Sequence, residues 1–344
     1  MASELERLLS QITSESARGV ARLAPLQRSP PGLSTVFTGV EALDDALREI
    51  YDDDSGGGSS GDAPLLELLG LPGSGKTQVL YHVCTTIALP RSTSGYESHV
   101  LLIDIDGKAS PRMLAQHMRD RVVRAAAMPA SEIEQAIAEA LRRVHFFAPS
   151  STQSLIATLA MLPKYVHDKG IAAGALLIDG LGANYWVDRK EAAHIRLRSR
   201  RATPFFRLQQ LLVDTLQLAH QRLGCLAVAA SLLLLPVLDS APRQASQDSS
   251  SGSQGASSQA RVIEAQLHEY RDHMIQRWSS VVSRSFVLDS ACVDGSRPSE
   301  GALTRVTFAP VDSRRQQARQ AAASRLFTAY VSQHGLRGST EVGS

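Results

Sequence analysis

An eight-residue run near the start of the chain has the residue types of a phosphate-binding loop. It fits the pattern G-x-x-x-x-G-K-[ST] and reads Gly70-Leu71-Pro72-Gly73-Ser74-Gly75-Lys76-Thr77. Glycines let backbone N–H groups turn toward a phosphate, the Lys76 ammonium can reach the β- and γ-phosphate oxygens, and the Thr77 hydroxyl can bind Mg²⁺. The run therefore predicts a site for ATP and Mg²⁺, against the alternative of a glycine turn formed by chance.

The flanks of this run have the periodicity that such a loop needs. Residues 65–69 are short and mainly apolar, as in a buried strand, and residues 78–89 have helical spacing until Pro90. We expect a strand, a loop and a helix in that order, with ATP phosphates at the helix N-terminus.

Two further strands deliver carboxylates that suit Mg²⁺ chemistry. Residues 173–179 form an apolar strand ending in Asp179, and residues 99–106 form one ending in Asp106. A strand-terminal aspartate after a P-loop typically orients Mg²⁺ through water, so Thr77 and Asp179 are the predicted metal site. A plain turn residue is the alternative for Asp179.

The remaining periodicity alternates between helices and strands. We expect helices over 111–127, 131–143, 152–167 and 203–222, and strands over 144–148 and 225–235. A capping box of Ser131 and Glu134 is predicted to open the second helix. This order indicates an α/β fold with a mainly parallel sheet flanked by helices, and short antiparallel strands over 281–289, 303–309 and 325–331 at its C-terminal edge.

Composition limits the class of protein. The chain has 344 residues, 43% of them hydrophobic, a net charge of +2 and three cysteines. No apolar stretch reaches the roughly 18 residues of a membrane span, and the N-terminus is not a signal peptide, so we expect an intracellular protein that binds no membrane. The small net charge does not by itself indicate nucleic acid.

Two regions lie outside the expected core. Residues 1–37 contain a helix over 2–18 and a proline-containing linker, and residues 239–260 are a serine-rich low-complexity insertion. Residues 52–61 are predicted to be a polar surface loop. The core domain is therefore expected over 38–344.

The same motifs carry a resemblance to a known family. The segments 38–47 and 102–107, together with the P-loop, resemble the RecA-type recombinase core, and Tyr185-Trp186-Val187-Asp188-Arg189 is similar to the eukaryotic recombinase paralogues. The resemblance implies a RecA-like P-loop NTPase core in a nuclear protein. It further implies a subunit that joins other recombinase paralogues in a hetero-oligomer for homologous recombination repair of DNA double-strand breaks.

Three departures from that family affect the expected activity. Active recombinases have a glutamate where Asp106 stands, to activate water, and a glutamine at the position of Ser231. Asp106 remains the candidate catalytic residue, but we expect ATP binding with weak or no hydrolysis. The small N-terminal DNA-binding domain of full-length recombinases has no counterpart, so a terminal subunit is expected.

A cluster of arginines falls where the first DNA-facing loop of a RecA-type core lies. Its members are the candidate DNA-binding residues Arg196, Arg198, Arg200 and Arg201. They are predicted to contact single-stranded or branched DNA, directly or through the complex. A solvated or partner-facing surface explains the cluster equally well.

Two other functions fit the P-loop. One is an autonomous DNA-stimulated ATPase that forms its own filament, with Asp106 as the base. The other is a P-loop kinase for a small metabolite, although the sequence has no signature of an acceptor site.

Overall fold

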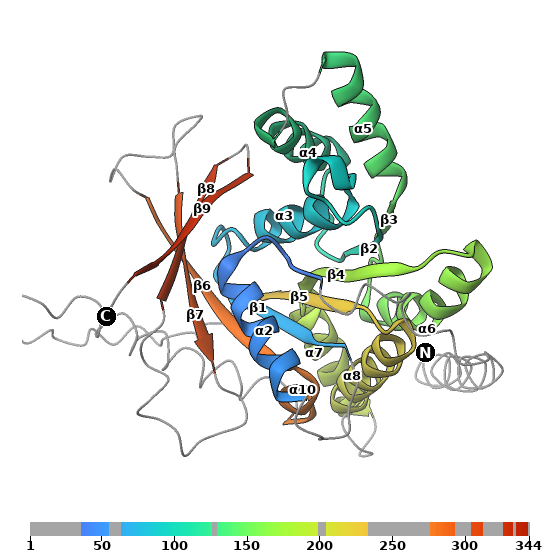
Figure 1. Ribbon diagram of the computed structural model, residues 1–344. Coiled ribbons are helices and arrows are strands. Elements are labelled where there is room, and N and C mark those ends of the chain that lie inside the picture. Colours follow the sequence, from blue (N-terminus) through green and yellow to red (C-terminus); the bar gives the residue numbers. More distant parts are fainter. Residues whose placement is uncertain are drawn as a thin grey trace, which may run out of the picture.

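A computed structural model shows a central sheet between two layers of helices (Figure 1). The structure describes residues 36–54, 63–125, 129–198, 204–232, 276–292, 304–311, 326–332 and 335–342. The predicted helix at 2–18 and the insertion at 239–260 lie outside these ranges. Within them, no helix is long and apolar enough to cross a membrane.

The sheet has nine strands in the order β3-β2-β4-β5-β1-β6-β7-β8-β9. Its strands are β1 (Leu65–Gly70), β2 (His99–Asp104), β3 (Val144–Phe147), β4 (Ala173–Leu181), β5 (Leu226–Leu232), β6 (Arg284–Cys292), β7 (Thr304–Val311), β8 (Leu326–Ser332) and β9 (Gly335–Val342). All pairings from β3 to β6 are parallel, and those from β6 to β9 are antiparallel. The sheet is thus mainly parallel around β1, as predicted.

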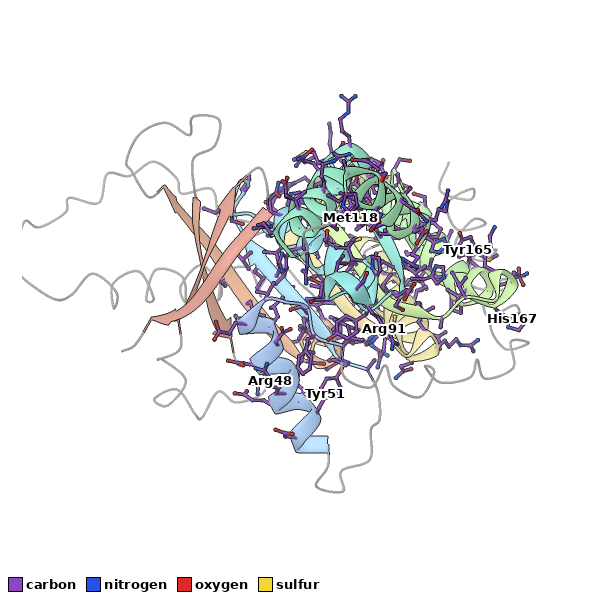
Figure 2. All side chains as sticks on the ribbon, turned by 45° about the horizontal axis from the view of Figure 1, so that its top comes forward. Arg48, Tyr51, Arg91, Met118, Tyr165 and His167 are labelled. Carbon is purple, nitrogen blue, oxygen red and sulfur yellow. The ribbon has the colours of Figure 1, made fainter. Side chains whose placement is uncertain are left out.

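Helices cover both faces of the parallel part. They are α2 (Glu41–Asp54), α3 (Lys76–Ala88), the short 3₁₀ helix η1 (Arg91–Thr93), α4 (Pro111–Ala125), α5 (Ala130–Arg142), α6 (Thr152–Lys169), α7 (Tyr185–Arg198), α8 (Pro204–Leu223) and α10 (Gln276–Val281). In Figure 1, α3, α4 and α5 lie on one side of the sheet, and α6, α7, α8 and α10 on the other. Figure 2 labels Met118 on the first side and Tyr165 on the second.

The sheet has one apolar core on each face, because alternate residues of a strand point to opposite faces. On β1, Leu66 and Leu68 pack into the core shared with α2, α3 and α4, while Leu65 faces the core of α6, α8 and α10. Because helices cover both faces, β4 is buried along its whole length. Cys84 and Cys225 are both buried.

Several expected boundaries and pairings were wrong. The strand predicted over 281–289 corresponds to β6, which pairs antiparallel with β7, as predicted, but also pairs parallel with β1, which was not predicted. Residues 52–54, assigned to a surface loop, continue α2. The fourth antiparallel-edge strand, β9, had no sequence prediction.

The predicted capping box at Ser131 is also wrong. Helix α5 begins one residue earlier, with Pro129 as its N-cap and with no side-chain cap. The N–H groups of Glu132 and Ile133 donate to the Pro129 carbonyl, so the helix has already begun where Ser131 stands. The fixed φ of proline favours this earlier start.

Candidate functional site

The P-loop joins the carboxyl end of β1 to the N-terminus of α3. Gly73 and Gly75 have φ values of 82° and 89°, a backbone conformation that residues with a side chain rarely adopt. A Cβ on Gly70 would lie 2.4 Å from the Ser74 Oγ and 2.7 Å from the carbonyl oxygen of Leu288 on β6. Glycine at these positions therefore lets the loop turn tightly between β1, β6 and α3.

Lys76, the first residue of α3, lies back over this loop. Its ammonium donates to the carbonyl oxygens of Gly70 and Leu71, each at 2.8 Å, and to the Ser74 Oγ at 3.2 Å. Burial lowers the pKa of Lys76 to about 8, against the opposing attraction of nearby carboxylates. The direct partners of the ammonium are thus neutral oxygen atoms of the loop, as suits a group that binds phosphate.

Thr77 and Asp179 meet across the sheet. The Thr77 hydroxyl donates to Asp179 Oδ2 at 2.7 Å, so the second residue of α3 contacts the buried carboxylate near the end of β4. Burial raises the pKa of Asp179, while the Thr77 hydrogen bond opposes the rise. The structure therefore brings together the two residues predicted from separate segments.

The donor set at this point fits Mg²⁺. A hydroxyl and a carboxylate oxygen converge, and both are hard oxygen ligands of the kind that Mg²⁺ prefers. Mg²⁺ in P-loop sites takes its other ligands from phosphate and water, so few protein ligands suffice. Among the described residues, no group of three or more His, Cys, Asp or Glu side chains could hold a metal ion.

Asp106 lies in the bend after β2, beside β4. The strand was expected to reach residue 106 but ends at Asp104, whose carboxylate accepts the N–H groups of Lys108 at 3.3 Å and Ala109 at 2.8 Å. These bonds turn the chain. A Cβ on Gly180, where φ is 81°, would lie 2.8 Å from the Asp106 carboxyl carbon, so glycine lets that carboxylate approach β4 closely.

Lys108 is a residue of this site that the sequence did not reveal. Its ammonium lies 3.0 Å from Asp106 Oδ2, in an ion pair whose lysine side chain is 72% exposed. Only the position of a basic residue two places after Asp106 would have indicated it, and that spacing is common in surface turns. Asp104 was likewise not assigned the role of holding this bend.

Ser231 lies on β5, the strand between the P-loop strand β1 and the Asp179 strand β4. It is fully buried on β5, in register with Leu69 of β1 and Leu181 of β4. Its hydroxyl has no hydrogen-bond partner among the described residues. The short side chain therefore stays within the sheet, where a glutamine would extend beyond it.

The predicted DNA-facing segment forms a helix where a loop was expected. Arg196 and Arg198 lie within α7, but the structure does not describe their side chains. Arg200 and Arg201 lie outside the described residues. The first turn of α7 carries an exposed Trp186, with the Arg189 guanidinium 5.5 Å from its ring centre. The contact of these arginines with DNA therefore stays a prediction.

The start of α7 is fixed to α6 by a buried polar contact. Asp188 Oδ2 accepts the hydroxyl hydrogen of Thr152, at 2.6 Å, and both side chains are buried. Burial raises the pKa of Asp188, and the Thr152 hydrogen bond opposes that rise. Nearby, Phe205 packs edge-to-face on Tyr185, whereas Phe206 is 54% exposed.

Comparison with known proteins found a similar DNA repair protein. The chain is 26% identical over 223 residues to a mouse (Mus musculus) protein described as DNA repair protein XRCC2, and the match covers 65% of this chain and 71% of that protein. The chain resembles XRCC2, a RecA-family paralogue. No protein-family model matches the chain.

The likeness to XRCC2 and the sheet together confirm the RecA-like α/β fold predicted from the sequence. The P-loop strand β1 lies between β5 and β6, with the Asp179 strand β4 beyond β5. The similar mouse protein is described as a DNA repair protein.

Proposed function

We propose that this chain is a recombinase paralogue of the XRCC2 kind that binds ATP with Mg²⁺ and works as one subunit of a hetero-oligomer with other recombinase paralogues. The contact between Thr77 and Asp179 at 2.7 Å carries the proposal, because it joins the P-loop helix to the strand that ends in the acidic motif. The likeness to XRCC2 supports the role in repair of DNA double-strand breaks by homologous recombination.

In this proposal each residue of the loop has a defined task. The glycines Gly73 and Gly75 let the backbone of the loop turn its N–H groups toward the phosphates, and Lys76 compensates their charge. Thr77 and Asp179 would hold Mg²⁺, which when bound supplies charge for the phosphate oxygens. Binding therefore depends on residues from β1, α3 and β4.

Hydrolysis is slow in this proposal because the general base is poorly placed. Asp106 has a shorter side chain than the glutamate of active recombinases, so its carboxylate reaches less far toward a water at the terminal phosphate. Ser231, buried in the sheet, supplies no group to the terminal phosphate.

The binding half of the proposal is tested by titration with a fluorescent ATP analogue and Mg²⁺, followed by single-turnover hydrolysis. We expect saturable binding to the purified chain and very slow turnover with or without DNA. Brisk DNA-stimulated hydrolysis that is abolished by Asp106→Ala would instead favour the autonomous ATPase, and transfer of phosphate to a small molecule would favour the kinase.

The partner half is tested by affinity capture from nuclear extract with identification of the bound peptides. We expect other recombinase paralogues in stoichiometric amounts. Light scattering should show a one-to-one complex when a captured paralogue is mixed with the purified chain. Long homopolymers of this chain alone, formed with ATP and DNA, would contradict the hetero-oligomer.

Direct DNA contact is tested with a variant in which Arg196, Arg198, Arg200 and Arg201 are all replaced by Gln. If these side chains neutralise phosphates, the salt slope of single-strand binding should fall by about 0.7 for each phosphate that is no longer neutralised. An unchanged slope together with failure to capture the partner would assign this segment to a protein interface.

A further inference from the structure

Lys108 lies at the site, but the proposed binding of ATP gives it no role. It lies in the bend after β2, where Asp104 accepts its backbone N–H at 3.3 Å and Asp106 pairs with its ammonium at 3.0 Å. The bend is therefore fixed by one carboxylate while the long side chain, 72% exposed, is held by another.

The charge of Lys108 is felt at the P-loop. Burial is the main cause that lowers the pKa of Lys76, and the positive charge of Lys108 lowers it further. Asp106 acts on Lys76 in the opposite direction and also raises the pKa of Asp179. The close approach of the Asp106 carboxylate to Gly180, the residue after Asp179 on β4, places the Lys108–Asp106 pair beside the predicted metal ligand.

The balance of charge at this edge is unfavourable for a triphosphate. Three carboxylates, those of Asp104, Asp106 and Asp179, gather at the ends of β2 and β4, and Lys76 is the cation on the P-loop itself. Mg²⁺ held by Thr77 and Asp179 would compensate part of the phosphate charge, and a phosphate that enters beside Asp106 would still be stabilised by a further cation. Lys108 is the cation placed to do so.

We propose that Lys108 is a second phosphate-binding cation. When ATP binds, the Lys108 ammonium breaks its ion pair with Asp106 and binds the terminal phosphate instead. This contact favours ATP over ADP. The inference rests on the proposed function, since it concerns the same nucleotide site. The exposed side chain is a flexible four-carbon stem whose ammonium is held by an ion pair with Asp106. Exchange of Asp106 for a phosphate therefore costs little free energy.

This role differs from that of a simple surface pair. If Lys108 only neutralised Asp106, its removal would cease to matter once Asp106 were itself neutral. If Lys108 binds the phosphate, its removal weakens ATP binding whether or not Asp106 is charged. ADP lacks the terminal phosphate and should be affected little in either case.

The experiment is a set of calorimetric titrations of ATP and ADP, each with Mg²⁺, into the full-length chain. The variants are Lys108→Ala, Asp106→Asn and the two combined. Lys164→Ala is the matched control, because Lys164 is also an exposed lysine paired with an aspartate, Asp168, but on α6. Circular dichroism of each variant checks that the fold is retained.

We expect Lys108→Ala to weaken ATP binding roughly fivefold and ADP binding less than about twofold, as suits an exposed charge pair of about 1 kcal/mol. The selective loss should persist in the Asp106→Asn background, and Lys164→Ala should bind like the wild type. Equal losses for ATP and ADP, or a loss that disappears in the Asp106→Asn background, would overturn the role of Lys108 alone. A wild-type chain that binds neither nucleotide would overturn the proposed function and this inference with it.

Discussion

Lys76 contributes to phosphate binding only while its ammonium is protonated. In the nucleotide-free protein its pKa is lowered to about 8, with burial as the main cause. A phosphate favours the protonated form, so binding takes up a proton wherever the free lysine has lost one. Protonation of Lys76 is therefore complete well below pH 8 and decreases as the pH rises through that value.

The first prediction is that ATP affinity falls as pH rises from 7.5 to 9.5. Above the pKa of about 8 the affinity should fall by up to about tenfold per pH unit, because each binding event must first protonate Lys76. The measurement is a titration of fluorescent ATP at fixed Mg²⁺ and ionic strength.

The control for this pH effect is Lys76→Ala. Loss of a charge-assisted contact of roughly 1.5–3 kcal/mol should weaken binding at pH 7.5 by about 10- to 100-fold. It should also flatten the pH profile above 7.5. A variant that keeps the wild-type slope would show that another group causes the pH dependence.

At the residue scale, the sequence indicated the candidate ATP and Mg²⁺ residues but not the ion pair between Lys108 and Asp106. The P-loop pattern and the apolar strand before Asp179 identified residues that the structure brings within 2.7 Å of each other, because parallel strands bring their carboxyl ends to one edge. Lys108 escaped prediction because a basic residue after a glycine is common in solvated turns. The role of Lys108 depends on its ion pair with Asp106, and this pair forms only in the folded bend.

At the scale of elements, a buried carboxylate joins the P-loop strand to its neighbours. Glu67 of β1 is only 3% exposed and accepts hydrogen bonds from Trp278 Nε1 on α10 and the Ser285 hydroxyl on β6, each at 2.8 Å. These contacts hold β6 and α10 against the strand that leads into the P-loop.

The second prediction is that Glu67→Ala lowers the free energy of unfolding by about 2–6 kcal/mol. The substitution leaves two buried donors without this acceptor, at roughly 1–3 kcal/mol each. Urea unfolding can be followed by Trp278 fluorescence in a Trp186→Phe background, since the chain has two tryptophans.

Two further variants make this test specific. Glu67→Gln keeps one acceptor oxygen and should cost less than Glu67→Ala. Glu139→Ala removes a glutamate of α5 whose contact with Gln135 is exposed, and should change stability by less than about 0.5 kcal/mol. If Glu67→Ala were as mild as Glu139→Ala, the buried contacts would have no structural importance.

The third prediction concerns the attachment of α7 to α6. Asp188→Ala leaves the buried Thr152 hydroxyl without its 2.6 Å acceptor and should cost about 1–3 kcal/mol. A double-mutant cycle with Thr152→Val should give a coupling of roughly 0.5–3 kcal/mol. Additive effects of the two substitutions would show that the contact does not join the helices.

The elements themselves could be predicted in part from the sequence. Strands buried on both faces, such as β4, have continuous apolar runs that are hard to mistake. Helix α7 was missed because its polar and aromatic residues have almost no helical periodicity, and its position depends on the buried contact of Asp188 with α6. The parallel pairing of β6 with β1 is a long-range contact, which no local pattern encodes.

On the scale of the whole molecule, the nucleotide site and the sheet are one structure. The P-loop follows the central strand β1, which is hydrogen-bonded to β5 on one side and to β6 on the other. The site also takes residues from β2 and β4, so its geometry exists only when the parallel sheet has formed. A ligand that binds this site should therefore stabilise the folded chain as a whole.

The fourth prediction is that ATP with Mg²⁺ raises the thermal unfolding midpoint of the isolated chain. At a ligand concentration about 100 times the Kd, linkage contributes about 2.7 kcal/mol, which corresponds to a rise of several degrees in a domain of this size. Lys76→Ala should lose most of the rise at the same ATP concentration, whereas Lys164→Ala on α6 should keep it. Scanning calorimetry with and without nucleotide makes the measurement, and equal rises for both variants would mean that ATP acts away from the P-loop.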